Sequence, residues 1–325
     1  MPSLGTKLIE LYTQLGGLAI VGLILGRFLP SVVPLYLGKF LFWAGIPIAV
    51  VGFVRRSDLS GAIWLAPAIA WVAILLGAFL SWGWLKIMGK RPENSSDADA
   101  LPEPAEESWN TPRQGSFLLS SMVGNTGYMG YPVILALFGD RYFAWALFYD
   151  LLGTVVGAYG LGVVLAAEFG EGGHKSPGEL ALAIVKTPTL WGLGLGLLIR
   201  DVPLFPPLEQ SLASFGRLAI AASLVLLGMR LSQLHNWSSI KPASVSLAIK
   251  MLLVPLALGI GLFLFDLPSA PHLILVLQMG MPPAFATLVI AEAYNLDRDL
   301  TVTALALGSM GFLLLLPFWL WLFGV

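Results

Sequence analysis

The chain has 325 residues, of which 57% are hydrophobic and only 11% are charged. Soluble domains contain about 25% charged residues, so this composition excludes an ordinary water-soluble protein. The net charge of −1 provides no basic surface for a nucleic acid. The absence of cysteine excludes disulfide frameworks, thiolate catalysis and cysteine-based metal sites.

Ten long apolar segments follow one another along the chain. A membrane-spanning helix needs about 20 mostly apolar residues, and glycine or proline inside such a helix is tolerated. We therefore predict an all-α polytopic protein of the lipid bilayer with about ten transmembrane helices. The segments lie near 8–28, 33–54, 61–87, 114–139, 142–168, 180–199, 208–230, 241–265, 271–294 and 300–323.

One segment, 89–113, interrupts this pattern with acidic residues and prolines, and we expect a flexible acidic loop. The loops also predict the orientation, because Lys and Arg accumulate on the cytoplasmic side. With an even number of spans, both termini share a side with only a few basic residues, and we expect that side to be non-cytoplasmic, in a bacterial-type inner (plasma) membrane. The larger basic set, on the predicted cytoplasmic side, is Arg27, Lys39, Lys86, Lys90, Arg91, Arg113, Lys175, Lys186, Arg230, Lys241 and Arg298.

Three short patterns recur in the same order and suggest an internal repeat. The first two pairs are 170 and 176 positions apart and the third about 151, a difference that the acidic insertion explains. Two halves of five spans, 1–169 and 170–325, would insert with opposite orientations, as in the inverted repeats of secondary transporters. The pairs are Gly22–Gly26 with Gly192–Gly196, Ile46–Gly52 with Ala222–Gly228, and Tyr131-Pro132 with Pro282-Pro283.

The fourth and ninth spans contain residues that break helices. Glycines and a proline crowd Ser120–Pro132, and Gln278–Pro283 repeats the pattern. Matching interruptions in two halves indicate a transport site, and half-helices beginning near Pro132 and Pro283 would direct their positive ends at an anion. The predicted substrate-binding residues are Asn125, Thr126, Gly127, Pro132, Gln278, Pro282 and Pro283.

The same residues carry a resemblance to a known family. Gly124–Gly139 resembles the span-four signature of the auxin efflux carrier family, which includes plant PIN-FORMED carriers and bacterial malonate-type permeases. Met281–Asp297 resembles the span-nine counterpart, and Lys186–Pro188 the start of span six. The resemblance implies the fold of bile-acid-type symporters, in which broken helices four and nine cross, and transport of an organic anion through that crossing. The short loop between spans five and six and the acidic loop differ from the family pattern and leave the substrate open.

Ionisable residues inside spans are functional candidates because burial there is costly. Asp150 and Lys250 both fall near mid-depth, so we predict proton or ion coupling through them, with a structural ion pair as the alternative. His174, His235 and His272 map to loops or span ends, so we expect no metal site. No nucleotide-binding loop or other cofactor motif occurs.

These observations predict a secondary active transporter rather than an enzyme. Its substrate would be a small organic anion, with H+ as the coupling ion or uniport driven by the membrane potential, and a homodimer is left open. A passive channel or sensor on the same fold is the alternative. An intramembrane aspartyl protease is disfavoured because Leu137–Asp140 and Asp150 do not match the required pair of aspartate motifs.

Overall fold

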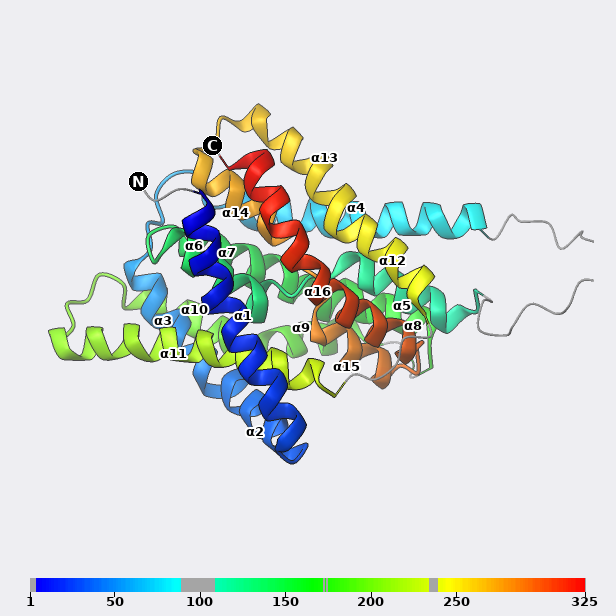
Figure 1. The fold of residues 1–325 in the computed structure, drawn as a ribbon, viewed down its shortest axis with the longest axis horizontal. Helices are drawn as coiled ribbons and strands as arrows, with labels where there is room; N and C mark the ends of the chain where they lie inside the picture. The colour runs from blue at the N-terminus through cyan, green and yellow to red at the C-terminus, as the bar shows by residue number, and fades with distance from the viewer. Residues whose placement is uncertain (1–3, 89–108, 172, 174, 234–238, 325) are drawn as a thin grey trace, which may run out of the picture.

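The computed structural model describes residues 4–88, 109–171, 173, 175–233 and 239–324, with side chains from residue 12 onward. The described residues form helices joined by short turns (Figure 1). Among them, six helical stretches are long and apolar enough to cross a membrane. These are α2 (Val32–Phe40) with α3 (Ile46–Arg56), α4 (Leu65–Met88), α7 (Phe143–Phe148) through α8 (Val163–Phe169), α11 (Pro206–Leu231), α12 (Ile240–Ala248) with α13 (Val254–Gly261), and α16 (Arg298–Phe323).

The other predicted spans coincide with bent, broken or shorter helices. A bend of 59° separates α9 (Pro177–Val185) from α10 (Pro188–Leu198). Two further spans are each broken into two helices, and α1 contributes a shorter apolar stretch. These elements are α1 (Leu4–Phe28), α5 (Thr111–Met122) with α6 (Tyr131–Phe138), and α14 (Ser269–Met279) with α15 (Phe285–Ala293). Each of the ten predicted segments therefore falls on helix, although six alone satisfy the length and apolarity of a continuous span.

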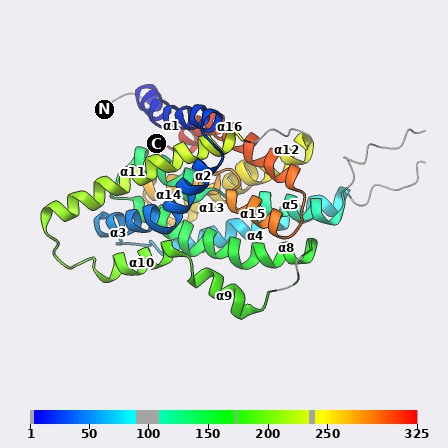
Figure 2. The ribbon, with the colours of Figure 1, turned by 90° about the horizontal axis from the view of Figure 1, so that it is seen from below.

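The helices pack in two groups. In the first group, α1 packs along α11, and α10 and α11 both pack against α3, with α2 beside α11. Figures 1 and 2 both show α11 beside α1. The second group consists of α4–α8 and α12–α16, in which α5 contacts α4, α8, α12 and α16. Helix α1 begins and α16 ends at the same end of the molecule (Figures 1 and 2). Within these helices, the Tyr12 hydroxyl donates a hydrogen bond to the Leu313 carbonyl.

Glycines allow α1 and α11 to approach backbone to backbone. A Cβ added at Gly22 would lie 2.1 Å from the Val225 carbonyl oxygen, and one at Gly228 would lie 2.1 Å from the Ala19 carbonyl oxygen. Small residues at helix contacts are a common means of close packing in membranes. Two glycines of the repeated sequence patterns thus join the first predicted span to the seventh.

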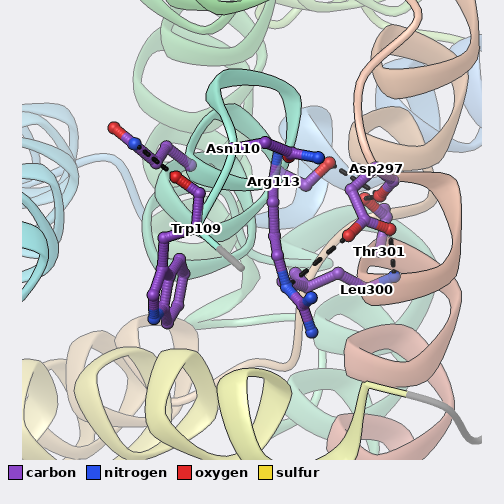
Figure 3. Close-up of polar contacts among 8 residues, drawn as sticks. Trp109, Asn110, Arg113, Asp297, Leu300 and Thr301 are labelled. Atoms are coloured by element: carbon purple, nitrogen blue, oxygen red, sulfur yellow. Dashed lines mark hydrogen bonds and ion pairs between the residues drawn. The ribbon is translucent and has the colours of Figure 1, made fainter. Parts of the chain in front are cut away.

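A polar cluster fixes the start of the broken helix α5 against the start of α16 (Figure 3). The Asn110 side chain accepts a hydrogen bond from the Arg113 backbone N–H at 3.0 Å, and Asp297 accepts one from the Leu300 N–H at 2.9 Å. Such caps satisfy backbone donors that a first helical turn leaves unpaired. The Arg113 Nε lies 3.7 Å from the Asp297 carboxylate, which links the two capped ends.

Candidate functional site

The first broken helix opens at residues 123–125. Helix α5 ends at Met122, and Val123 is extended. The Asn125 carbonyl then accepts hydrogen bonds from the N–H groups of Met129 and Gly130, at 3.3 and 3.1 Å, which starts a wide π-helical turn, η3 (Thr126–Gly130). The second half-helix therefore begins at Thr126, and the predicted start near Pro132 is wrong. Pro132 instead occupies the first turn of α6, where a residue without an N–H is tolerated.

The second break, between Met279 and Phe285, pairs with the first. The Asn125 N–H donates to the Pro282 carbonyl at 2.7 Å, and the Ala284 N–H donates to the Val123 carbonyl at 3.0 Å. Gly124 and Pro283 face each other in this antiparallel bridge. Non-helical backbone inside a membrane protein needs such internal partners. The two breaks therefore satisfy each other, and Pro283 pairs with Gly124.

Lys250 lies directly behind this pairing. It occupies a π-helical turn, η6 (Ile249–Leu253), is only 3% exposed, and its Nζ donates to the Met279 carbonyl at 2.5 Å. A Cβ on Gly124 would lie 3.2 Å from Nζ, so a glycine makes room for the ammonium group. A cation at the C-terminus of α14 interacts favourably with the helix dipole.

Asp150 lies beside the first break, in the π-helical turn η4 (Tyr149–Val155). Its Oδ1 accepts a hydrogen bond from the Thr126 hydroxyl at 2.5 Å, and its Oδ2 accepts one from the Tyr131 hydroxyl at 2.6 Å. A Cβ on Gly127 would lie 3.2 Å from Oδ2. Among the described residues Asp150 has no ion pair with Lys250. The two predicted coupling residues thus have separate partners.

A cavity of about 550 Å³ opens where the two breaks meet. Its wall contains the first residues of both second half-helices, so two helix N-termini adjoin it. It extends along α2, η4 and the bend before α10, and aromatic side chains form much of its surface. The lining residues used below are Lys39, Asn125, Thr126, Gly127, Tyr131, Asp150, Arg230, Ala284, Phe285 and Ala286.

Asn125 lies in the wall of this cavity and carries an amide nitrogen without a hydrogen-bond partner in the described part of the chain. Its side chain is 3% exposed, and its Nδ2 has no hydrogen-bond partner among the described residues. Buried polar groups without partners are uncommon and costly, so such a group often indicates a binding site for a ligand or water. A substrate oxygen in the cavity would provide the acceptor that Nδ2 lacks.

The structure brings together only some of the predicted binding residues. Asn125, Thr126 and Gly127 line the cavity, as does Asp150. Pro282 and Pro283 form the paired break. Gln278 is fully buried away from the cavity lining, where its Nε2 donates to the carbonyls of Thr126 and Ala146 at 3.4 and 3.3 Å.

Two cavity residues were not identified as site residues from the sequence. Tyr131 belongs to the quoted motif, but its hydroxyl reaches Asp150 only because the wide turn η3 sets its direction. Arg230 was counted only as a loop charge, although it lines the cavity. The only signal was its place at the end of the apolar segment 208–230, which does not show that it reaches the break.

A polar network joins the two helix groups at the opposite end of α2–α3 from the cavity residue Lys39. Asp140, between α6 and α7, has its Oδ2 3.6 Å from Arg56 and 3.3 Å from Arg217. The Ser57 hydroxyl donates to the Asp140 carbonyl at 2.9 Å. Asp140 and Asp150 thus have different partners, which provides no carboxylate pair for the protease alternative.

Two other sequence expectations concern residues away from the cavity. His272, expected at a span end, is buried in α14, where its Nε2 lies 2.9 Å from the Gly259 carbonyl oxygen. Most of the expected acidic loop, 89–108, lies outside the described residues.

A family model described as "Membrane transport protein" matches residues 110–320, which include both breaks and most of the cavity lining. The chain belongs to this family. The match agrees with the auxin efflux carrier resemblance of spans four and nine. The protein is therefore a membrane transporter, built from apolar helices.

Several relatives of this transporter are themselves named as uncharacterized transporters. One from Methanothermobacter thermautotrophicus is 25% identical over 290 residues, which cover 87% of each chain. One from Methanocaldococcus jannaschii is 26% identical over 238 residues, covering 64% of this chain and 68% of the relative. YfdV of Escherichia coli K12 is 25% identical over 202 residues, covering 60% and 63%.

Proposed function

We propose that this transporter is a secondary active carrier of a small organic anion, a carboxylate, that works by alternating access at the paired breaks. The observation that carries the proposal is the unpartnered amide of Asn125, a residue in the wall of a cavity that two helix N-termini border. Both features favour an anion, since the amide donates a hydrogen bond and helix N-termini carry partial positive charge. Among the other predicted residues, Thr126 and Gly127 line the same cavity. Gln278 lies outside the lining and donates a hydrogen bond to the Thr126 carbonyl.

The architectural part of the proposal is an inverted repeat of two five-helix halves, 1–169 and 170–325, with helices four and nine crossing at their breaks. The backbone pairing supports it. A shift of 159 positions relates Val123 to Pro282 and Asn125 to Ala284. The same shift relates the hydrogen bond from Asn125 to Pro282 to the one from Ala284 to Val123, as a two-fold symmetric pair. Helix starts support it as well. Val32 and Leu65 have counterparts 174 and 175 residues later at Pro206 and Ile240, whereas Thr111 and Phe143 have counterparts 158 and 155 residues later at Ser269 and Arg298. The difference falls at the acidic insertion.

The proposed orientation places both termini outside the cytoplasm of a bacterial-type plasma membrane. The cavity lining includes Lys39 and Arg230, which belong to the larger basic set, so we assign this conformation as the one open toward the cytoplasm. The network around Asp140 then closes the other side. Movement of one helix group against the other would exchange the two states.

We propose H+ as the coupling ion, carried by Asp150. Its two oxygens accept hydrogen bonds from hydroxyl groups of Thr126 and Tyr131, and a hydroxyl can turn to accept a hydrogen bond from a neutral carboxyl group. Lys250 has a different role in this proposal. Its Nζ is a structural hydrogen-bond donor to the Met279 carbonyl beside the second break, and Asp150 alone carries the exchanged proton.

The direct test is uptake by purified protein in liposomes, using a panel of labelled carboxylates under imposed pH and voltage gradients. Wild-type protein is expected to accumulate at least one carboxylate, whereas Asn125→Ala should abolish that uptake and fold normally. Gln114→Ala is the matched control, because its amide donates to the Trp109 carbonyl outside the cavity. Undiminished uptake by Asn125→Ala contradicts the site, and equilibration without accumulation indicates the channel alternative.

A further inference from the structure

Arg230, in the last turn of α11, is one of the residues that line the cavity. The guanidinium carbon lies 5.0 Å from the centre of the Phe285 ring. A second neighbour of the guanidinium group is α2, where a Cβ added at Gly38 would lie 2.8 Å from a guanidinium nitrogen. A glycine at 38 thus leaves space for the arginine to reach the cavity wall.

The charge of Arg230 has no carboxylate partner among the described residues. The nearest acid of the cavity, Asp150, has both oxygens engaged by hydroxyl groups. The Phe285 ring is the guanidinium's partner, through a cation–π contact. A carboxylate binds a guanidinium more strongly than a ring does, because two parallel charge-assisted hydrogen bonds form. An entering carboxylate would therefore be a better partner than the one present.

Other donors converge on the same region. Phe285 is the first residue of α15, and Ala284 and Ala286 also line the cavity, so the N–H groups of that first turn border it. The Asn125 amide lies in the same wall. We propose that Arg230 is the anion-selecting residue of the carrier and binds the carboxylate group of the substrate. This inference rests on the proposed function and deepens it.

The position of Arg230 also connects binding to movement. Arg230 belongs to the first helix group, through α11, whereas Phe285 belongs to the second, through α15. A carboxylate held between the guanidinium and the α15 N-terminus contacts both groups. Binding of the carboxylate replaces the contact between Arg230 and Phe285. It therefore changes the interaction that joins the two helix groups at the cavity.

The test is calorimetric binding to purified protein, with acetate, benzoate, malonate and succinate as probes and benzamide as the uncharged counterpart of benzoate. Wild-type protein is expected to bind at least one carboxylate and to bind benzamide much more weakly. Arg230→Gln should weaken carboxylate binding about 10- to 100-fold, the loss expected for a hydrogen bond to a charged group. Arg230→Lys, which keeps the charge, should recover part of this loss, and neither variant should change benzamide binding.

Arg298→Gln is the matched control, since Arg298 pairs with Glu292 at the surface, outside the cavity. Thermal unfolding of each variant checks the fold. If Arg230→Gln binds a carboxylate as tightly as wild type does, the role of Arg230 is overturned and the proposed carrier stands. If the wild-type protein binds none of the carboxylates, the organic-anion class fails, and the role of Arg230 fails with it.

Discussion

The carboxyl group of Asp150 is held by two hydroxyl groups and, among the described residues, by no cation. Thr126 and Tyr131 each donate to a different oxygen, and the residue is only 6% exposed. When a buried carboxyl group has no charged partner, its protonation changes its hydrogen bonds and removes a buried charge that no cation balances. This arrangement distinguishes Asp150 from Asp140, whose carboxylate lies beside two arginines.

Replacing Asp150 tests whether this proton exchange drives transport. With one coupled proton, a pH difference of one unit can support about tenfold accumulation of substrate. We expect Asp150→Asn to keep the hydrogen-bonding shape but to lose accumulation driven by a pH gradient, while exchange of substrate at equal pH continues. The measurement is liposome uptake with and without the gradient. Gradient-driven accumulation that survives in Asp150→Asn would assign the coupling to another residue or to the membrane potential.

The sequence identified the polar residues near the first break better than those near the second. Asn125 and Thr126 could be found because they stand among glycines inside an apolar segment. Gln278 was placed in the site by its position alone, but it precedes the end of α14 and its side chain turns toward the carbonyls of Thr126 and Ala146. Arg230 requires knowledge of which helices adjoin the break, and one sequence does not contain that information.

Among the elements, the contact between α1 and α11 depends most directly on a missing side chain. Gly22→Ala would place a methyl group 2.1 Å from the Val225 carbonyl oxygen, so the two helices must separate. We expect destabilisation of about 1–3 kcal/mol, the usual range for overpacking, observed as earlier thermal unfolding in detergent. Gly17→Ala, on the same helix, is the control because nothing lies within 4 Å of its added methyl group. Equal stability of both variants would show that the two helices do not pack in this way.

The positions of the elements followed from hydropathy, whereas the geometry of the breaks did not. Apolar runs located the helices, and clusters of glycine and proline located both interruptions. The half-helix starts at Thr126 because the Asn125 carbonyl accepts hydrogen bonds from two N–H groups. The Asn125 N–H donates to the carbonyl of Pro282, which belongs to a distant part of the chain. Such a long-range partner overrides the local preference that placed the start at Pro132.

For the whole molecule, the proposed alternating access depends on the contacts between the two helix groups. In the cavity wall, the two groups meet through the contact between Arg230 and Phe285. At the other end they meet through Asp140, with Arg56 and Arg217, and through Arg141, which lies 4.0 Å from Asp58. Hydrogen bonding to Ser60 lowers the pKa of the Asp58 carboxyl group, so this carboxylate stays charged at neutral pH.

Asp140→Asn should loosen the closed side without changing the cavity. Its two partly exposed ion pairs are worth up to about 1 kcal/mol each, so their loss should raise the population open on that side by up to about 30-fold. The natural absence of cysteine allows a single reporter, Val155→Cys, in the cavity wall. Membrane-impermeant thiol reagents, applied to right-side-out and inside-out vesicles, then measure access from each side.

In the Val155→Cys background, labelling should be faster from the side of Lys39 and Arg230, and Asp140→Asn should increase labelling from the opposite side. Glu292→Gln is the control, because it removes an ion pair with Arg298 that takes no part in the Asp140 network. If Asp140→Asn leaves the labelling from both sides unchanged, the network does not restrain the groups. In that case their closure depends on apolar packing, such as that of α7 against α3.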